Sequence, residues 1–232
     1  MIYSKLADIY DGLVKDEEAT KHWLRFVKKN IRGNKILELA CGSGEITIAM
    51  AKAGYNILAT DISSAMITQA QAKGSYPNLT YQVMDMRELQ LSESYDGVIC
   101  FCDSINYLED YKSLQQVFSG VYNALNDRGV FLFDMHHESR LKEFGKGWKE
   151  EGTIEGINYK WQIITQGDKL IHDFTLTADN QTFIETHHQT VFSLKKVESL
   201  LKDCGFDFEV IDDYDIFNED LKEKYFFKAK KQ

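Results

Sequence analysis

The chain has 232 residues, of which 44% are apolar and 27% are charged, a composition typical of a globular domain with room for an extension. Its net charge of −9 argues against a nucleic-acid partner, because such proteins need a basic face to displace counterions from phosphates. The first residues contain early acids and no apolar run, and no apolar stretch approaches the roughly 18 residues of a membrane span. We therefore expect a cytoplasmic protein without a signal peptide or a membrane partner.

Short apolar runs that suit buried strands alternate with amphipathic segments between residues 35 and 135. This alternation predicts an α/β fold, with a parallel sheet covered by helices on both faces and joined by right-handed crossovers. The predicted strands are 35–40, 55–60, 79–84, 97–102 and 129–135, and the predicted helices are 17–30, 44–53, 63–73 and 110–126.

The periodicity changes to two after about residue 145, where apolar and polar residues alternate. This pattern, broken by turns near 166–169 and 179–180, predicts an antiparallel β-meander. A helix over 193–204 and strands near 207–214 and 223–230 complete the chain. We thus expect one domain built from 1–144 and 193–232, with 145–192 as an antiparallel β insertion.

The segment Glu38-Leu39-Ala40-Cys41-Gly42-Ser43-Gly44 follows a predicted strand and opens a predicted helix. Glycines at such a turn let the backbone approach a ligand, and the helix N-terminus offers free N–H groups. A nicotinamide fingerprint would need a third glycine where Thr47 stands, and the Gly-Lys-Ser/Thr of a P-loop is absent.

Two acids follow the next two predicted strands. Asp61 is placed to accept hydrogen bonds from ribose hydroxyls, and Asp85 to accept one from an adenine amine, with Met86 packed on the ring. Either acid alone could simply cap a turn. Ligands of such sheets bind at the carboxyl ends of the strands, so the joint placement of the two acids favours a nucleoside-containing ligand.

With these motifs in place, the sequence resembles the class I S-adenosylmethionine-dependent methyltransferases. ELACGSG resembles their glycine-rich motif with Ala40 in place of the first glycine, and ATDIS, VMDM and YDGVICFCDSINYL resemble the three motifs that follow. The resemblance implies a Rossmann-like, doubly wound, mostly parallel seven-stranded sheet of order 3-2-1-4-5-7-6 and the cofactor S-adenosylmethionine. It implies these cofactor-binding residues: Tyr10, Glu38, Ala40, Gly42, Gly44, Asp61, Ile62, Asp85, Met86 and Cys102.

The leading ADIYDGL and the inserted meander are similar to those of small-molecule N- and O-methyltransferases, in which both segments cover the active site. This similarity would place Tyr10 over the cofactor, although an aromatic residue of an amphipathic helix would look the same. The predicted activity is methyl transfer to nitrogen or oxygen of a small molecule. The alternatives are a tRNA or protein methyltransferase and a module that binds the cofactor without turnover.

A sulfonium methyl group is already activated, so the protein needs mainly to align the acceptor and exclude water. The candidates for catalysis are His136 and Tyr10, and the candidates for substrate binding are Asp103, Asn106, Tyr107, His136 and Trp161. His136 could equally be an imidazole bonded within a loop. The adjacent histidines at 136–137 and 187–188 lack an evident third ligand, so we predict no metal.

Overall fold

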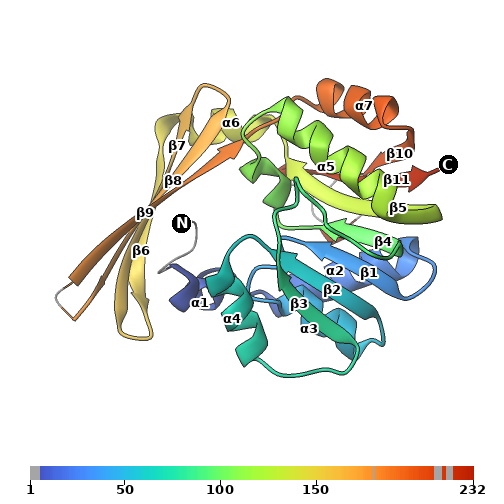
Figure 1. Cartoon of the computed structure of the whole chain (residues 1–232). Helices are drawn as coiled ribbons and strands as arrows, with labels where there is room; N and C mark the ends of the chain where they lie inside the picture. The colour runs from blue at the N-terminus through green and yellow to red at the C-terminus, as the bar shows by residue number, and fades with distance from the viewer. Residues whose placement is uncertain (1–5, 180, 212–215, 218–221) are drawn as a thin grey trace.

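The structure is a computed structural model that describes residues 6–179, 181–211, 216–217 and 222–232. It contains a large sheet and a small one (Figure 1). The strands of the large sheet are β1 Lys35–Leu39, β2 Asn56–Asp61, β3 Leu79–Val83, β4 Tyr95–Cys100, β5 Leu125–His136, β10 Phe206–Ile211 and β11 Lys224–Lys231.

The large sheet has the order β10-β11-β5-β4-β1-β2-β3. Its strands pair in parallel except β11, which is antiparallel to both β5 and β10. Counted along the chain, this is the order 3-2-1-4-5-7-6, so the predicted Rossmann-like methyltransferase fold is confirmed. The carboxyl ends of β1, β2, β4 and β5 therefore meet at one edge of the sheet.

Helices cover both faces of the large sheet because its strands alternate apolar side chains between two buried cores. In β5, Phe131 and Phe133 face one core, while Val130 and Leu132 face the other. The first core is closed by α5 Tyr111–Ala124 and α7 Leu194–Asp203, and the second by α2 Glu17–Asn30 and α3 Glu45–Lys52. The helix α4 Ser64–Ala72 packs on β2 and β3.

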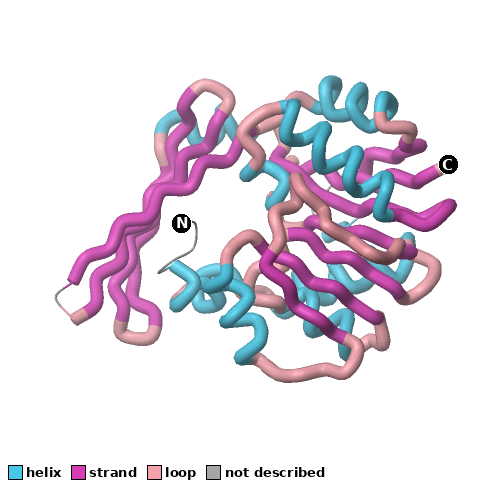
Figure 2. The backbone as a smooth tube through the Cα atoms, viewed as in Figure 1, coloured by secondary structure: helices cyan, strands magenta, loops and turns pink. Residues whose placement is uncertain are grey.

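The small sheet is an antiparallel meander with the order β6-β7-β8-β9, as predicted from its period of two (Figure 2). It consists of β6 Trp148–Ile154, β7 Ile157–Gln166, β8 Lys169–Ala178 and β9 Gln181–Thr190, preceded by α6 Ser139–Glu143 and η3 Phe144–Lys146. The strand β6 was not predicted, since the charged run in its sequence hides the alternation.

The N-terminal segment, η1 Leu6–Asp8 and α1 Tyr10–Val14, bridges the two sheets. Leu6 and Ile9 are buried in one cluster with Phe174 and Leu176 of β8. The backbone N–H of Leu6 also donates to Glu185 Oε1 of β9 at 3.1 Å. In the described part of the chain, no helix is long and apolar enough to cross a membrane.

One predicted strand ends early. The expected strand 97–102 stops at Cys100, because Cys102 and Asp103 adopt left-handed backbone angles with φ of 59° and 58°. Such angles are unfavourable for side chains other than glycine, and the turn leads directly into η2 Ser104–Tyr107. Part of the expected strand 207–214 lies outside the described residues, as does Asn180 in the expected turn 179–180.

Candidate functional site

The loop between β1 and α3 has the backbone of a ligand cradle. Ala40, Gly42 and Gly44 all have left-handed angles, with φ of 52°, 53° and 83°. A Cβ added to Gly42 would meet no atom within 4 Å, so the space beside the Gly42 backbone is open. A Cβ on Gly44 would lie 3.0 Å from atoms of both Ala70 and Tyr81, so that glycine is needed for packing instead. Ala40 has a left-handed φ although it carries a Cβ, so its backbone is strained.

Asp61 ends β2 directly beside this loop. Its Oδ2 accepts a hydrogen bond from the Gly42 backbone N–H at 2.9 Å, and its Oδ1 accepts one from the Ser63 N–H at 2.8 Å. Burial raises the pKa of Asp61, while these backbone donors act in the opposite direction. The carboxylate thus joins two strand ends, and each oxygen retains a lone pair for a ligand hydroxyl.

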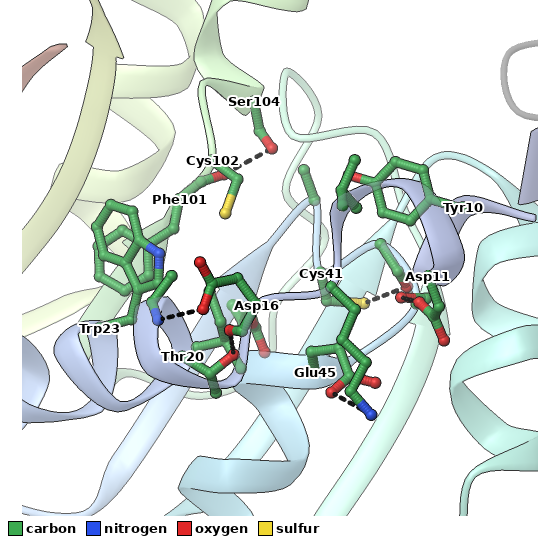
Figure 3. Close-up of a pocket in the computed structure, with 18 residues that line it drawn as sticks. Tyr10, Asp11, Asp16, Thr20, Trp23, Cys41, Glu45, Phe101, Cys102 and Ser104 are labelled. Atoms are coloured by element: carbon green, nitrogen blue, oxygen red, sulfur yellow. Dashed lines mark hydrogen bonds and ion pairs between the residues drawn. The ribbon is translucent and has the colours of Figure 1, made fainter. Parts of the chain in front are cut away.

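A pocket opens where the N-terminal segment passes over the ends of β1 and β4 (Figure 3). It is partly open to solvent. Of the predicted cofactor residues, the pocket is lined by Tyr10, Glu38, Ala40, Gly42 and Cys102. Trp23 and Phe101 form an apolar wall, with ring centroids 4.4 Å apart.

Glu38 is the most unusual group of this pocket. Its side chain is buried, and its Oε2 has no hydrogen-bond partner among the described residues. Burial raises the pKa of Glu38 to about 8. A buried, unpaired carboxyl oxygen is unfavourable unless a ligand donor reaches it, so Glu38 suits the positively charged end of a ligand.

The remaining predicted cofactor residues lie outside the pocket, at neighbouring strand ends. Ile62 is 54% exposed beside Asp61. Asp85 is held by its neighbour Arg87, whose Nη2 donates to Asp85 Oδ2 at 2.5 Å. This pair lowers the pKa of Asp85. Met86 is half-buried and packs against the core under α5. The predicted adenine contacts of these residues stay predictions.

The N-terminal segment is fastened to the glycine loop by Asp11. The Ser43 hydroxyl donates to Asp11 Oδ1 at 2.5 Å, and Lys73 forms an ion pair with Asp11 Oδ2. Lys73 Nζ also donates to Glu45 Oε1 at 2.7 Å. This places the half-buried Tyr10 ring beside the pocket, where burial raises the pKa of its hydroxyl.

A second group of polar side chains joins the large sheet to the small one, and we call it the inter-sheet cluster. It consists of Tyr107, His136, Trp161, His172, His187 and Gln189. His136 Nε2 lies 2.9 Å from Gln189 Oε1, and the Tyr107 hydroxyl lies 3.2 Å from His187 Nδ1. Three of the predicted acceptor-site residues thus fall in this cluster.

Burial lowers the pKa of two histidines of the cluster, His172 and His187. The Trp161 indole N–H donates to His172 Nδ1 at 3.2 Å, so the proton of a neutral His172 is on Nε2. Burial lowers the pKa of His172 to about 4 and also lowers that of His187. Both imidazoles are therefore neutral near pH 7.

Asn106 ties the two sheets together. Its Oδ1 accepts from the His136 backbone N–H at 3.0 Å, and its Nδ2 donates to the Thr190 carbonyl at 2.6 Å. Asn106 is fully buried and uses both of its polar atoms within the protein. Its predicted role in substrate binding stays a prediction.

Asp103 is bonded to a pair of groups that the sequence did not single out. Lys224 Nζ donates to Asp103 Oδ2 at 2.7 Å and to Asp134 Oδ2 at 2.9 Å. The Asp103 backbone N–H also donates to Asp134 Oδ2 at 3.0 Å, which holds the left-handed turn in place. Asp103 Oδ1 lies 3.5 Å from His136 Nδ1.

Sequence reasoning missed Lys224, Asp134, His172 and Gln189 as site residues. Lys224 and Gln189 come from strands after the meander turns, so no local motif links them to Asp103 or His136. Asp134 was hidden in the apolar run GVFLFDM, although a fully buried acid in a central strand is itself a signal.

Comparisons with known proteins agree on one family. A methyltransferase domain model matches residues 36–129. The Bacillus subtilis (strain 168) protein named "Putative methyltransferase YqeM" is 34% identical over 100% of this chain and 98% of its own length. The fold is similar to that of an S-adenosylmethionine-dependent methyltransferase from Clostridium acetobutylicum, with a TM-score of 0.81, 24% identity and coverage of 99% and 98% of the two chains. The S-adenosylmethionine-bound amino pentose methyltransferase CalS10 of Micromonospora echinaspora has a TM-score of 0.76, 16% identity and coverage of 100% and 98%.

Proposed function

The chain belongs to the class I S-adenosylmethionine-dependent methyltransferases, and we propose that it methylates a nitrogen or oxygen atom of a small molecule. The observation that carries this proposal is the meeting of His136, at the carboxyl end of β5, with Gln189 of the small sheet. This contact joins polar side chains of both sheets at the carboxyl end of β5, and His136 lies 3.5 Å from Asp103, which follows the pocket residue Cys102 in the chain.

S-adenosylmethionine is the cofactor, and it supplies a methyl group activated by a sulfonium. We assign its ribose hydroxyls to Asp61, which already binds the glycine loop, and its adenine to Asp85, Met86 and Ile62. The unpaired Oε2 of Glu38 suits the ammonium of the methionine part. The open space beside the Gly42 backbone fits this assignment, because a side chain there would fill the cradle.

We propose that residues 145–192 form an insertion whose sheet covers the active site from the side opposite the glycine loop. His136 is the candidate proton acceptor, since it is buried between the sheets and its Nδ1 lies 3.5 Å from Asp103. Tyr10 is a candidate for shielding the reacting groups from water.

Charge favours a small acceptor over RNA. The pocket is lined by four acids, Asp11, Asp16, Glu38 and Glu45, and by one cation, Lys15. Lys15 is paired with Glu45, and Lys73 with Asp11, so these cations offer no surplus of positive charge to the phosphates of RNA. The name of CalS10 describes it as an amino pentose methyltransferase, which supports a sugar-sized acceptor for this fold.

Two measurements test the proposal. Titration calorimetry with S-adenosylhomocysteine should show one-site binding, and wild-type protein should transfer tritiated methyl groups to components of an ultrafiltered cell extract. Labelling of only the retained macromolecules would favour a tRNA or protein methyltransferase. Tight binding without any transfer would favour a non-catalytic module.

A further inference from the structure

Asp103 presents one carboxylate oxygen that the protein does not use. Its Oδ2 accepts from Lys224 at 2.7 Å, whereas its Oδ1 is buried and has no hydrogen-bond partner among the described residues. His136 Nδ1 lies 3.5 Å from this Oδ1, which is longer than the roughly 2.7–3.2 Å of an N–H···O hydrogen bond. A buried carboxylate oxygen left in this way is unfavourable unless a ligand donates to it.

The facing nitrogen of His136 is also an acceptor. His136 Nε2 lies 2.9 Å from Gln189 Oε1, and an amide oxygen only accepts, so Nε2 holds the proton whenever the ring is neutral. His136 Nδ1 then has a lone pair directed at the side of Asp103. Two acceptors thus lie 3.5 Å apart with no donor of the described residues between them. A group with two N–H bonds on one nitrogen satisfies both, whereas a hydroxyl has a single donor.

The network behind Asp103 keeps it negatively charged. Burial alone would raise the pKa of Asp103, but His136 in its protonated form and Lys224 reverse this effect and lower it. Burial raises the pKa of Asp134, so the proton of this acidic pair goes to Asp134 first. Lys224 contacts the Oδ2 atom of each carboxyl group, so it does not engage the Oδ1 atom of the charged Asp103.

The other groups of the inter-sheet cluster offer no compensating positive charge. His172 and His187 are neutral near pH 7, and Glu185 lies beside His187 with Oε2 at 3.4 Å from Nε2. Lys224 is the permanent cation beside Asp103, and it is already paired with two carboxyl groups. A carboxylate acceptor would therefore be repelled.

From this geometry, and resting on the proposed function, we propose that the methyl acceptor is a small molecule with a primary or secondary amine, and that Asp103 Oδ1 receives one of its N–H bonds beside His136. An ammonium that binds there transfers one proton to His136 Nδ1. The resulting imidazolium forms an ion pair with Asp103 through Nδ1 and donates to Gln189 from Nε2. The freed nitrogen lone pair forms the new N–C bond, and the C–S bond breaks with its electron pair left on sulfur.

The first test uses the wild-type protein and one ultrafiltered cell extract, split in two. One half is treated with an amine-selective acetylating reagent, and both are incubated with tritiated S-adenosylmethionine. We expect labelled product from the untreated half and none from the blocked half. The product should be stable to mild base, which releases labelled methanol from methyl esters. Equal labelling of both halves, or base-labile label, would overturn the amine assignment.

The second test separates acceptor binding from cofactor binding. Asp103→Asn keeps the shape and the oxygen that Lys224 contacts but removes the charge. With the labelled amine fraction as substrate, it should lower kcat/KM by about 10- to 100-fold, the effect of one charge-assisted hydrogen bond. Its affinity for S-adenosylhomocysteine should remain within about twofold of wild type, because Asp103 does not line the cofactor pocket. The matched control is Asp127→Asn at the opposite end of the sheet.

The outcomes distinguish a failure of the proposed methyltransferase function from a failure of the amine inference. A wild-type protein that does not bind S-adenosylhomocysteine, or that labels nothing in either half, contradicts the proposed function itself. Transfer that survives amine blocking leaves the methyltransferase intact and contradicts the amine inference alone. Full activity of Asp103→Asn toward the amine fraction would contradict the role of Asp103, even if the acceptor is an amine.

Discussion

The two halves of the proposed site, one for the cofactor and one for the acceptor, are built in different ways. The glycine loop and Asp61 form the cofactor half within a short stretch of chain, through backbone angles and a hydrogen bond between Asp61 and Gly42. The acceptor half gathers Asp103, Gln189 and Lys224 from elements far apart in the sequence. Local backbone geometry thus specifies the first half, whereas tertiary packing specifies the second.

Lys224→Met should break the acceptor half most severely. It leaves Asp103 and Asp134 buried without their shared cation, and losing one partner of a buried ion pair costs about 3–5 kcal/mol of unfolding free energy. Urea unfolding at pH 7 measures this loss. A change within about 0.5 kcal/mol, as for an ordinary surface substitution, would show that the pair is not a structural element.

The same variant has a defined pH dependence. Burial already raises the pKa of Asp134, so its protonated form is favoured in the folded state. Protonation of Asp134 contributes its full stabilisation when the pH is below the ordinary pKa of an aspartate. This stabilisation is lost as the pH rises through the raised pKa of the folded state. Because removing Lys224 raises that pKa further, the loss in Lys224→Met should be larger at alkaline pH than at mildly acidic pH. If the loss of unfolding free energy in Lys224→Met became larger as the pH is lowered, this predicted pH dependence would be contradicted.

Asp61→Ala should break the cofactor half. It removes the acceptor of the Gly42 and Ser63 N–H groups together with the proposed partner of the ribose. We expect the affinity for S-adenosylhomocysteine to fall by about 100-fold or more. The variant loses at least one charge-assisted hydrogen bond to the ligand, and the glycine loop is no longer held in place before binding. Calorimetry measures it, and wild-type affinity in this variant would refute the assignment of Asp61.

Trp161→Phe should have a smaller effect, confined to the acceptor half. It leaves His172 Nδ1 without its donor, at a cost of about 1–3 kcal/mol. The matched control is Trp148→Phe, because Trp148 has a ring contact with Trp161 but its indole forms no hydrogen bond with the described residues. Thermal unfolding should separate the two variants, whereas an equal loss in both would indicate that ring volume alone matters.

Ala40→Gly should have the smallest effect. It relieves a left-handed residue of about 1–2 kcal/mol of strain, but glycine increases the entropy of the unfolded chain by a similar amount. We expect a net change in stability below about 1 kcal/mol and little change in S-adenosylhomocysteine affinity. A large gain in affinity would show that Ala40 tunes cofactor binding.

The sequence predicted the positions of the glycine loop and of Asp61 at neighbouring strand ends because these signals are local, and their contacts with the cofactor stay predictions. The strand–glycine–helix order around Gly42 and the acid at the end of β2 are readable within a few residues. The acceptor half was predicted only in part. His136 and Asp103 follow strands and could be named, but their partners Gln189 and Lys224 depend on how the meander and β11 pack. The left-handed turn at Cys102 was missed because neither residue of that turn is a glycine.

A crystal structure with S-adenosylhomocysteine bound tests the central claim most directly. We predict that the Asp61 carboxylate contacts both ribose hydroxyls, that the adenine lies between Ile62 and Met86, and that the sulfur faces Asp103 and His136 below the small sheet. An adenine far from Asp85, or a sulfur directed away from the inter-sheet cluster, would contradict the account.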